Sequence, residues 1–375
     1  MAFIYDRVNK IGGAERVLLE LHAIWPDAPL YTSVYDSKHA PWARDFDIKM
    51  TFLQYIPFAR NHHEWFAWLT PFAFSTLQFD EYDVVLSVTS AEAKGIITKP
   101  DTLHICYCLT PTRYLWSGVD IYKKETGFGI FQSLVQTLFC WFLPILRRWD
   151  IIASQRPDKY IAISKRVKKR IEKYYQRAVQ EVIYPPIKTD FFQPKNESDG
   201  KDGYYVCVSR LVPYKRIDLV VHACTRLNRR LIVIGTGSDR DRLQTLAGPT
   251  VTFVDHYLTD EALFGYYRNC RAFIFAGDED FGIVAGEAQA SGKPIIAYKE
   301  SGIAEIVEDG KTGILFASQS AKSLEKAIIQ FETMDFKSSI CRRNALQFNS
   351  ERFRKEIQEY IETEWKRHKH IVETF

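Results

Sequence analysis

The stretch that most strongly decides the fold is residues 272–287, which read AFIFAGDEDFGIVAGE. Its first four residues, Ala272–Phe275, are apolar and predict a buried strand. A turn that contains glycine follows, and a helix is expected to open near Ile283. This succession of strand, turn and helix is typical of a parallel sheet that helices cover on both faces.

Similar short apolar runs, separated by longer periodic segments, recur along the whole chain. They are continuously apolar rather than alternating, which favours a parallel sheet. Further strands are expected at Ala2–Tyr5, Tyr82–Ser87, Leu103–Cys108, Lys159–Ile163, Tyr204–Ser209, Arg230–Gly235, Thr250–Val254 and Pro294–Ala297. The sequence therefore predicts an α/β fold with two doubly wound, Rossmann-like domains that face each other across a cleft.

The 375 residues suffice for two domains of ordinary size. Pro185 and Pro186 cannot continue a helix or a central strand, and a polar stretch follows them at 195–203. We place the domain boundary there, with a first domain at 1–185 and a second at 186–350. A long amphipathic helix at 351–375 is expected to cross back to the first domain.

Two carboxylates, Glu279 and Glu287, flank the glycine turn of the opening stretch. The backbone amides of Gly282, Ile283 and Val284 would lie at a helix N-terminus, where unpaired N–H groups and the helix dipole attract phosphate. Carboxylates accept hydrogen bonds from paired sugar hydroxyls, so one can take a ribose and the other a hexose. The pattern indicates a site for a sugar nucleotide.

A carboxylate beside phosphates needs a cationic partner, and Arg210 and Lys215 follow the predicted strand Tyr204–Ser209. Arg210 can hold phosphate oxygens with two hydrogen bonds, and Lys215 adds a point charge. Together they would neutralise a leaving diphosphate without a metal ion. The alternative is that Asp278, Glu279 and Asp280 bind Mg²⁺ or Mn²⁺.

A pair of glycines, Gly12 and Gly13, follows the first predicted strand and precedes a helix. Without a Cβ atom, such residues let the backbone approach a ligand closely. Taken alone, a pair of glycines more often forms only a tight loop.

The run from Val206 to Phe316 resembles the nucleotide-binding half of the retaining family-4 glycosyltransferases, also called group 1. The matching pieces are Arg210 with Lys215, Gly235-Thr236-Gly237, Glu279 through Glu287, Ala290-Ser291-Gly292-Lys293-Pro294, and Gly302-Ile303-Ala304-Glu305-Ile306-Val307 with Gly310 and Gly313. The resemblance implies the two-domain GT-B fold, a nucleotide-diphosphate sugar donor and retention at the anomeric carbon.

The same resemblance implies roles for single residues. Arg210, Lys215 and Glu279 would be catalytic, and Glu279 would also bind hydroxyls of the donor sugar. Glu287 would bind the ribose. The remaining donor-binding residues would be Gly12, Gly13, Gly235, Phe281, Gly282, Ile283 and Val284.

The first half is similar, more narrowly, to bacterial O-antigen and capsule mannosyltransferases of that family. The residues that carry this similarity are Gly12-Gly13-Ala14-Glu15, Ala93-Lys94-Gly95, residues 107–116 (YCLTPTRYLW) and Ile163-Ser164. Lys94 and Arg113 are candidates for acceptor or sugar contacts, with a structural role as the alternative. Relatives commonly carry His where this chain has Leu109.

The narrower resemblance implies transfer of mannose from GDP-mannose to a glycan or lipid-linked glycan, in surface polysaccharide synthesis. A UDP-hexose donor is the alternative. Leu109 supports a second alternative, a relative that binds nucleotide sugars without turnover. No cofactor or metal is expected.

The composition bears on location and partners. Seven cysteines without a Cys-x-x-Cys pair favour reduced thiols in the cytoplasm, and Met1–Asp6 lacks the features of a signal peptide. Aromatic residues make up 14% of the chain, and basic residues crowd 165–177. That basic stretch predicts either a solvated helix face or attraction to anionic lipids at the inner membrane face. Residues 128–146 predict a buried or interfacial helix, and no nucleic-acid motif accompanies the basic stretch.

Overall fold

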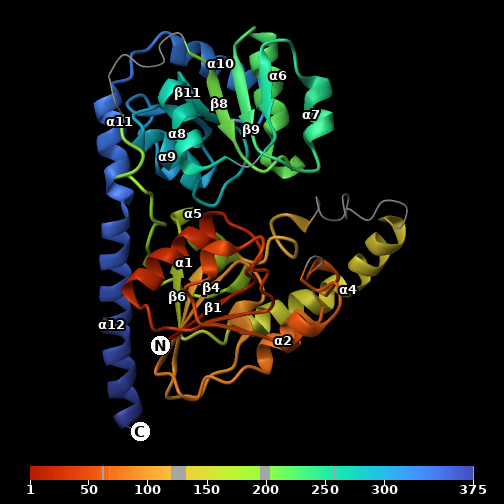
Figure 1. The fold of residues 1–375 in the computed structure, drawn as a ribbon, viewed down its shortest axis with the longest axis vertical. Helices are drawn as coiled ribbons and strands as arrows, with labels where there is room; N and C mark the ends of the chain where they lie inside the picture. The colour runs from red at the N-terminus through yellow and green to blue at the C-terminus, as the bar shows by residue number, and fades with distance from the viewer. Residues whose placement is uncertain (61–62, 67, 120–131, 195–202, 257, 375) are drawn as a thin grey trace. The chain divides into compact units, whose positions relative to one another are not determined.

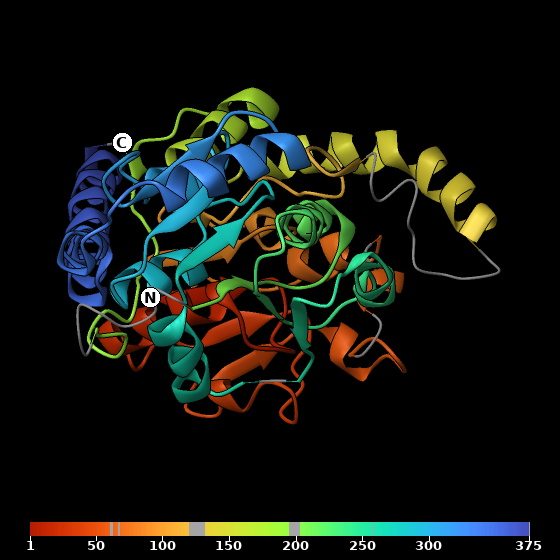
Figure 2. The same ribbon diagram turned by 90° about the horizontal axis from the view of Figure 1, so that it is seen from above.

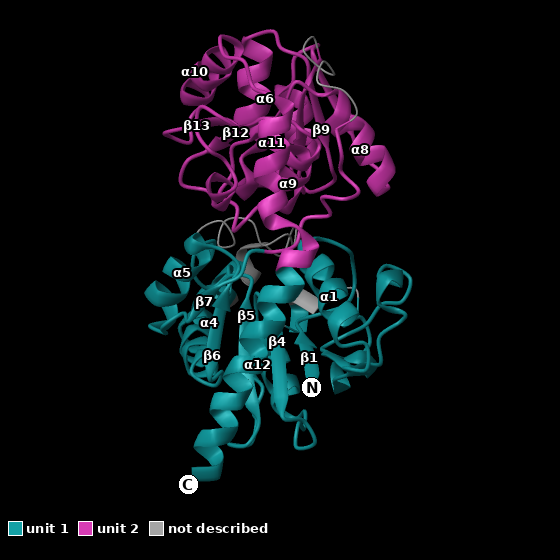
Figure 3. Cartoon of the chain, turned by 90° about the vertical axis from the view of Figure 1, so that its left-hand side faces the viewer, with its two compact units in different colours: residues 1–184, 353–375 teal, residues 185–352 magenta. Residues whose placement is uncertain are grey.

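A computed structural model describes residues 1–60, 63–66, 68–119, 132–194, 203–256 and 258–374. The chain divides into two compact units, one of residues 1–184 with 353–375 and the other of residues 185–352 (Figure 3). The divisions therefore fall at Tyr184 and Arg352, close to the prolines and to the final helix that the sequence singles out. Part of the predicted polar boundary, 195–202, lies outside the described residues.

Unit 1 contains a parallel sheet of seven strands in the order β3-β2-β1-β4-β5-β6-β7. The strands are β1 (Ala2–Tyr5), β2 (Leu30–Thr32), β3 (Ile48–Met50), β4 (Val84–Thr89), β5 (Leu103–Cys108), β6 (Lys159–Ala162) and β7 (Glu181–Val182). The helices include α1 (Gly13–Ile24), α2 (Thr70–Ser75), α4 (Gln132–Ser154) and α5 (Lys165–Tyr175) (Figure 1). Every residue of β1, β4 and β5 is buried, including the polar residues Ser87 of β4 and His104 of β5.

Unit 2 contains a parallel sheet of six strands in the order β10-β9-β8-β11-β12-β13. The strands are β8 (Tyr205–Val208), β9 (Leu231–Ile234), β10 (Val251–Val254), β11 (Ala272–Phe275), β12 (Ile295–Tyr298) and β13 (Gly313–Phe316). The helices are α6 (Ile217–Arg226), α7 (Arg240–Leu246), α8 (Asp260–Asn269), α9 (Ile283–Ala290), α10 (Ala321–Glu332) and α11 (Ser338–Ala345), many of them visible in Figure 2. The two parallel sheets confirm the predicted fold class.

The final helix, α12 (Ser350–Thr374), begins in unit 2 and packs along unit 1 for the rest of its length. The ring of its Phe353 lies 6.0 Å from that of Tyr107 in β5. Two ion pairs join the helix to the sheet and its covering helix. Arg354 Nη1 lies 2.8 Å from Glu20 Oε2 of α1, and Glu364 Oε2 lies 2.9 Å from Lys159 Nζ of β6. The helix therefore covers one face of the unit 1 sheet through both apolar and charged contacts.

Two segments that the sequence treats as ambiguous form helices. Ser164 caps α5 by accepting a hydrogen bond from the Val167 amide at 3.0 Å, as predicted. The predicted helix at 128–146 corresponds to α4, which begins at Gln132 and continues to Ser154, whereas 128–131 lie outside the described residues. Of the helices described, none is both long and apolar enough to cross a bilayer.

His104 of β5 gives the sheet of unit 1 a dependence on pH. Its ring is fully buried and its Nε2 lies 2.9 Å from Ser87 Oγ. Burial lowers the pKa of His104 to about 3. The unfolded chain, with a pKa near 6.5, therefore binds a proton that the folded chain excludes, so stability falls as pH drops from about 6.5 towards 3.

We expect the His104→Asn variant to show a flatter loss of unfolding free energy between pH 7 and pH 4.5 than the parent chain. Urea unfolding at several pH values measures this slope. His370→Gln, at an exposed histidine of α12, should keep the parent slope. Equal slopes in all three proteins would contradict the assignment.

Candidate active site

The site in unit 2 lies at the point where the strand order reverses. β8 is the first strand of this sheet in sequence, and its neighbours β9 and β11 lie on opposite sides of it. In sheets of this kind, ligands bind outside the carboxyl ends of the strands at that switch point. The loop after β8 carries Arg210 and Lys215, and the loop after β11 carries Glu279.

The structure brings Lys215 and Glu279 into direct contact. Lys215 Nζ donates a hydrogen bond to Glu279 Oε1 within an ion pair, and both side chains are largely buried. Lys215 also lies 5.9 Å above the ring of Phe275, the last residue of β11. A lysine and a carboxylate separated by 64 residues thus meet at the switch point.

Arg210 lies on the same loop but at the surface. Its Nη2 donates a hydrogen bond of 2.7 Å to the Tyr214 hydroxyl. An exposed guanidinium on a loop that also carries Lys215 is placed to add positive charge to that edge of the sheet.

The backbone around Glu279 is fixed by the turn that follows β12. Ser301 Oγ accepts a hydrogen bond of 3.1 Å from the Glu279 amide, and the Gly302 amide donates one of 2.8 Å to the Glu279 carbonyl. A Cβ atom at Gly302 would overlap the backbone of Asp280. The glycine at 302 is therefore required for this close approach.

Helix α9 begins immediately after this loop. Gly282 precedes it with φ of 97°, a conformation that favours glycine, and the half-buried Ile283 and Val284 form its first turn. Phe281 is buried, and its ring lies 5.6 Å from that of Phe348. The first amides of α9 have no partner one turn earlier in the helix, which is the usual basis of phosphate binding at such a terminus.

Glu287 lies farther along α9, on the face that packs into the unit. Its side chain is fully buried. Contact between this carboxylate and a ribose therefore stays a prediction from the resemblance.

Gly235 directly follows β9 with φ of 142°, and a Cβ atom there would overlap the Ser209 carbonyl oxygen. We expect Gly235→Ala to destabilise the chain by about 2 kcal/mol, because alanine is strained at this φ and its Cβ atom collides with the Ser209 carbonyl oxygen. It should also weaken donor binding, because Ser209 precedes Arg210.

The matched control for this change is Gly265→Ala in helix α8, where nothing lies within 4 Å of the added atom. Removing a glycine from a helix interior should raise stability by about 0.5–1 kcal/mol. Urea unfolding and calorimetric titration with GDP measure both effects. A Gly235→Ala protein as stable as the parent would refute the argument.

Unit 1 has its own switch point, between β1 and β4. Gly12 precedes α1 and Gly13 is its first residue, and both are exposed in the turn after β1. Asp6, directly after β1, bridges to the neighbouring loop. Its carboxylate accepts hydrogen bonds from Thr89 Oγ1 at 2.7 Å and from the amides of Ser90 at 2.8 Å and Ala93 at 3.0 Å.

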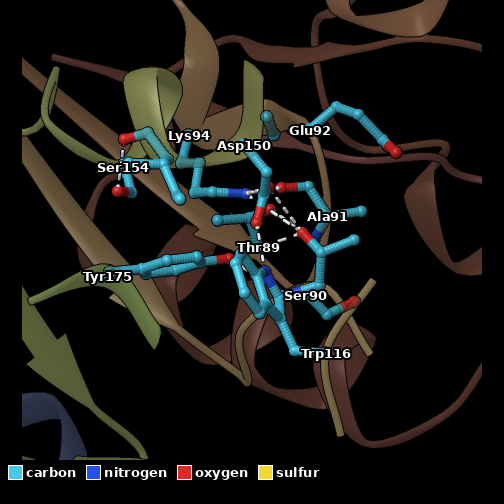
Figure 4. Close-up of polar contacts among 12 residues, drawn as sticks. Thr89, Ser90, Ala91, Glu92, Lys94, Trp116, Asp150, Ser154 and Tyr175 are labelled. Atoms are coloured by element: carbon cyan, nitrogen blue, oxygen red, sulfur yellow. Dashed lines mark hydrogen bonds and ion pairs between the residues drawn. The ribbon is translucent and has the colours of Figure 1, made fainter. Parts of the chain in front are cut away.

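Lys94 lies in the short turn η4 (Ala93–Gly95) and is buried with its ammonium group inside the unit. It donates to Asp150 Oδ1 at 2.5 Å, to the Ala91 carbonyl at 2.5 Å and to Thr112 Oγ1 at 3.1 Å. Figure 4 shows the Lys94 ammonium directed at Asp150, with Tyr175 and Trp116 nearby. This burial favours the structural alternative for Lys94.

Asp150, from helix α4, accepts three hydrogen bonds in the buried network around Lys94. Besides Lys94, its carboxylate accepts hydrogen bonds from Thr112 Oγ1 at 2.8 Å and from Trp116 Nε1 at 2.7 Å. Burial opposes the charge of Lys94, but the charge and hydrogen bond of Asp150 prevail, and the pKa of Lys94 is raised. The network ties the loops after β4 and β5 to α4.

The loop after β5 carries the two remaining positions that the sequence raises. Leu109 is half-buried, and its amide donates to the Thr89 carbonyl at 2.8 Å. Arg113 is half-buried in the same loop. Next to it, Tyr114 donates to the buried carboxylate of Glu92 at 2.5 Å.

Asp6, Glu92 and Asp150 are not among the residues predicted from the sequence. Asp6 and Glu92 each lie in the loop that follows a predicted strand. A place at the carboxyl end of a strand was therefore the signal in the sequence that could have found both residues. Asp150 carries no such signal, because it lies inside a helix far along the chain from the residues it binds.

Comparisons with known proteins concern the family of unit 2 and the fold of both units. Residues 188–348 match the family model of glycosyl transferases group 1. An uncharacterized glycosyltransferase of Methanocaldococcus jannaschii is 28% identical over 184 residues, which are 48% of this chain and 50% of that protein. A GDP-mannose-dependent alpha-(1-6)-phosphatidylinositol monomannoside mannosyltransferase of Mycobacterium tuberculosis is 32% identical over 176 residues, 40% of this chain and 46% of that protein. The chain thus spans about half the length of the curated relatives it matches.

Among solved structures, the Anabaena protein HepE in complex with UDP-glucose aligns with a TM-score of 0.68 and 18% identity. The alignment covers 96% of this chain and 99% of that one, so the likeness of fold extends over both units. The match to the group 1 glycosyl transferase family therefore covers nearly all of unit 2, and the fold shared with this solved structure is the GT-B fold.

Proposed function

We propose that the chain is a retaining glycosyltransferase that moves a hexose from a nucleotide-diphosphate sugar to a glycan or lipid-linked glycan. The observation that carries the proposal is the contact between Lys215 and Glu279 at the switch point of unit 2, directly before the N-terminus of α9. Positive charge, a sugar-binding carboxylate and unpaired helix amides are the groups that a sugar diphosphate requires.

In the proposed reaction, the bond between the anomeric carbon and the diphosphate oxygen breaks as the acceptor oxygen attacks from the same face. The acceptor's proton passes to the departing diphosphate oxygen. Negative charge grows on the diphosphate, so Lys215 and Arg210 bind the transition state more strongly than the ground state. Glu279 holds hydroxyls of the donor sugar and keeps the Lys215 ammonium in place.

The proposed donor is GDP-mannose, with a UDP-hexose as the alternative. The M. tuberculosis relative is GDP-mannose-dependent by name, which supports GDP-mannose as the donor. HepE was solved with UDP-glucose, which keeps the second open. We further propose that the product enters surface polysaccharide and that the enzyme works in the cytoplasm at the inner face of the membrane.

We also propose that the diphosphate needs no metal ion, because Lys215 and Arg210 supply the counter-charge. The acidic stretch 278–280 would otherwise be the metal ligand, but the Glu279 carboxylate is already bound by Lys215. Full activity in excess chelator is the expected result. Activity that falls with chelator and returns with Mg²⁺ or Mn²⁺ would support the metal site.

A donor screen tests the proposed function. GDP-mannose, UDP-glucose and UDP-galactose are each incubated with the protein and a lipid-extract acceptor, and released GDP or UDP is measured. We expect acceptor-dependent release of GDP from GDP-mannose. Nucleotide binding in a thermal-shift assay without release from any donor would instead favour the non-catalytic alternative that Leu109 suggests.

A further inference from the structure

An unusual part of unit 1 is the segment 52–72, which turns large aromatic side chains outwards. It contains the short turns η2 (Phe52–Tyr55) and η3 (His63–Phe66) and leads into α2. The exposed fractions are 80% for Tyr55, 71% for Phe58, 48% for Trp65, 64% for Trp68 and 60% for Phe72. Such a density of exposed aromatic residues marks an interaction surface.

The inner side of this segment is already packed. Leu53, Ala59 and Ala73 are buried together with Val34. The core beneath this segment is therefore complete without the outer aromatic residues. These residues form a second apolar face, which points away from that core.

Helix α4 shows the same arrangement. Its buried side chains include Leu143, Asp150 and Ala153. On the opposite face, Trp141 is 68% exposed, Ile145 is 58% exposed and Ile152 is 55% exposed. The spacing of four and seven residues places these three along one stripe of the helix.

Segment 52–72, through α2, and helix α4 both contact one short turn. Both α2 and α4 pack against η4, which holds Lys94. We call the exposed aromatic and aliphatic side chains of 52–72 and 141–152 the aromatic surface. Its described charged residues that are exposed are Arg60 and Arg148, both cations.

We propose that the aromatic surface binds the interfacial region of a lipid bilayer that contains anionic lipids. Trp and Tyr side chains favour the level of the headgroups, apolar side chains enter the acyl boundary, and cations attract anionic lipids. A second protein surface is the alternative occupant, but the exposed charged residues that the structure describes in this surface are cationic, which complements an anionic membrane. The proposal specifies the membrane partner of the proposed function and rests on it only for the lipid-linked acceptor.

Helix α5, the basic helix, is the competing contact. Part of the charge of the basic stretch is used inside the unit, since Arg170 of α5 is buried and Arg177, which follows the helix, donates to the Pro157 carbonyl at 2.7 Å. Lys165, Lys169 and Lys173 are exposed. We assign these lysines no part in the binding.

Vesicle co-sedimentation tests the proposal with the full chain and vesicles of phosphatidylcholine, with or without phosphatidylglycerol. We expect binding to the mixed vesicles and at least a tenfold loss of partitioning in the variants Trp141→Ser/Ile145→Ser and Phe58→Ser/Trp68→Ser. The control Ile329→Ser/Ile371→Ser changes residues that are 50% and 57% exposed elsewhere and should bind as the parent does. Brominated lipids should quench the parent's tryptophan fluorescence more than that of the Trp141 variant.

Three outcomes would overturn the proposal. The parent could fail to bind either vesicle, the Lys165→Glu/Lys169→Glu variant could lose binding while the aromatic variants keep it, or the aromatic variants could bind normally and instead turn a dimer into a monomer in light scattering. Thermal melting shows whether each variant is folded. Release of nucleotide from the donor, measured with a soluble glycan acceptor, reports the proposed function separately from vesicle binding.

Discussion

Replacing Lys215 by Ala is expected to lower turnover by about a hundredfold or more, with a much smaller effect on donor affinity. The lysine is the buried cation beside Glu279, and charge develops on the diphosphate only as the sugar bond breaks. An interaction that strengthens in the transition state changes kcat more than KM. Arg210→Ala should also lower kcat. Steady-state kinetics with the donor found in the screen gives both constants.

The control for Lys215→Ala is Lys311→Ala, which removes an exposed lysine paired with Glu308 at 3.2 Å in the same unit. Turnover should be unchanged. A double variant with Glu279→Gln completes a cycle, and its loss should be smaller than the product of the single losses because the two side chains act together. Near-normal turnover in both Lys215→Ala and Arg210→Ala would contradict the proposal that these two side chains stabilise the leaving diphosphate.

Asp150→Ala is expected to destabilise the chain by about 3–5 kcal/mol. The change leaves the Lys94 ammonium buried without its carboxylate partner, because the Lys94 side chain is only 2% exposed. It also removes the acceptor of Thr112 Oγ1 and Trp116 Nε1. Urea unfolding measures the effect, and Lys94→Met combined with Asp150→Leu should recover part of it because no unpaired charge stays buried.

An exposed pair provides the comparison. Lys99 and Asp80 lie 3.2 Å apart with side chains 55% and 59% exposed. Asp80→Ala should cost less than about 1 kcal/mol, since water solvates both groups. If Asp150→Ala costs no more than Asp80→Ala, the network of Figure 4 does not hold the two loops together.

The sequence predicts those strands whose burial is complete. Ala2–Tyr5, Leu103–Cys108 and Ala272–Phe275 form as predicted, because strands buried on both faces are mostly apolar, with His104 as the exception among them. Four strands were not predicted, namely β2, β3, β7 and β13. Of these, β3 and β7 are short and contain Lys49 and Glu181. At the edges of a sheet, charged side chains are tolerated and the apolar signal disappears.

The site could be predicted in part for a related reason. Lys215 and Glu279 each follow a strong strand, and the parallel sheet places the ends of neighbouring strands together. Lys94 was assigned by resemblance, and its burial depends on Asp150, 56 residues away on a different element. Nothing local in either segment indicates that contact, because tertiary packing creates it.

The two units differ in how they can be assembled during synthesis. Unit 2 is one continuous segment, whereas unit 1 receives residues 353–374 only after all of unit 2 has left the ribosome. Until then, the face of the unit 1 sheet that Phe353 contacts has no cover, and Tyr107 lacks its aromatic neighbour. The unit that is made first is consequently the unit that is completed last, and its apolar surface stays exposed during that interval.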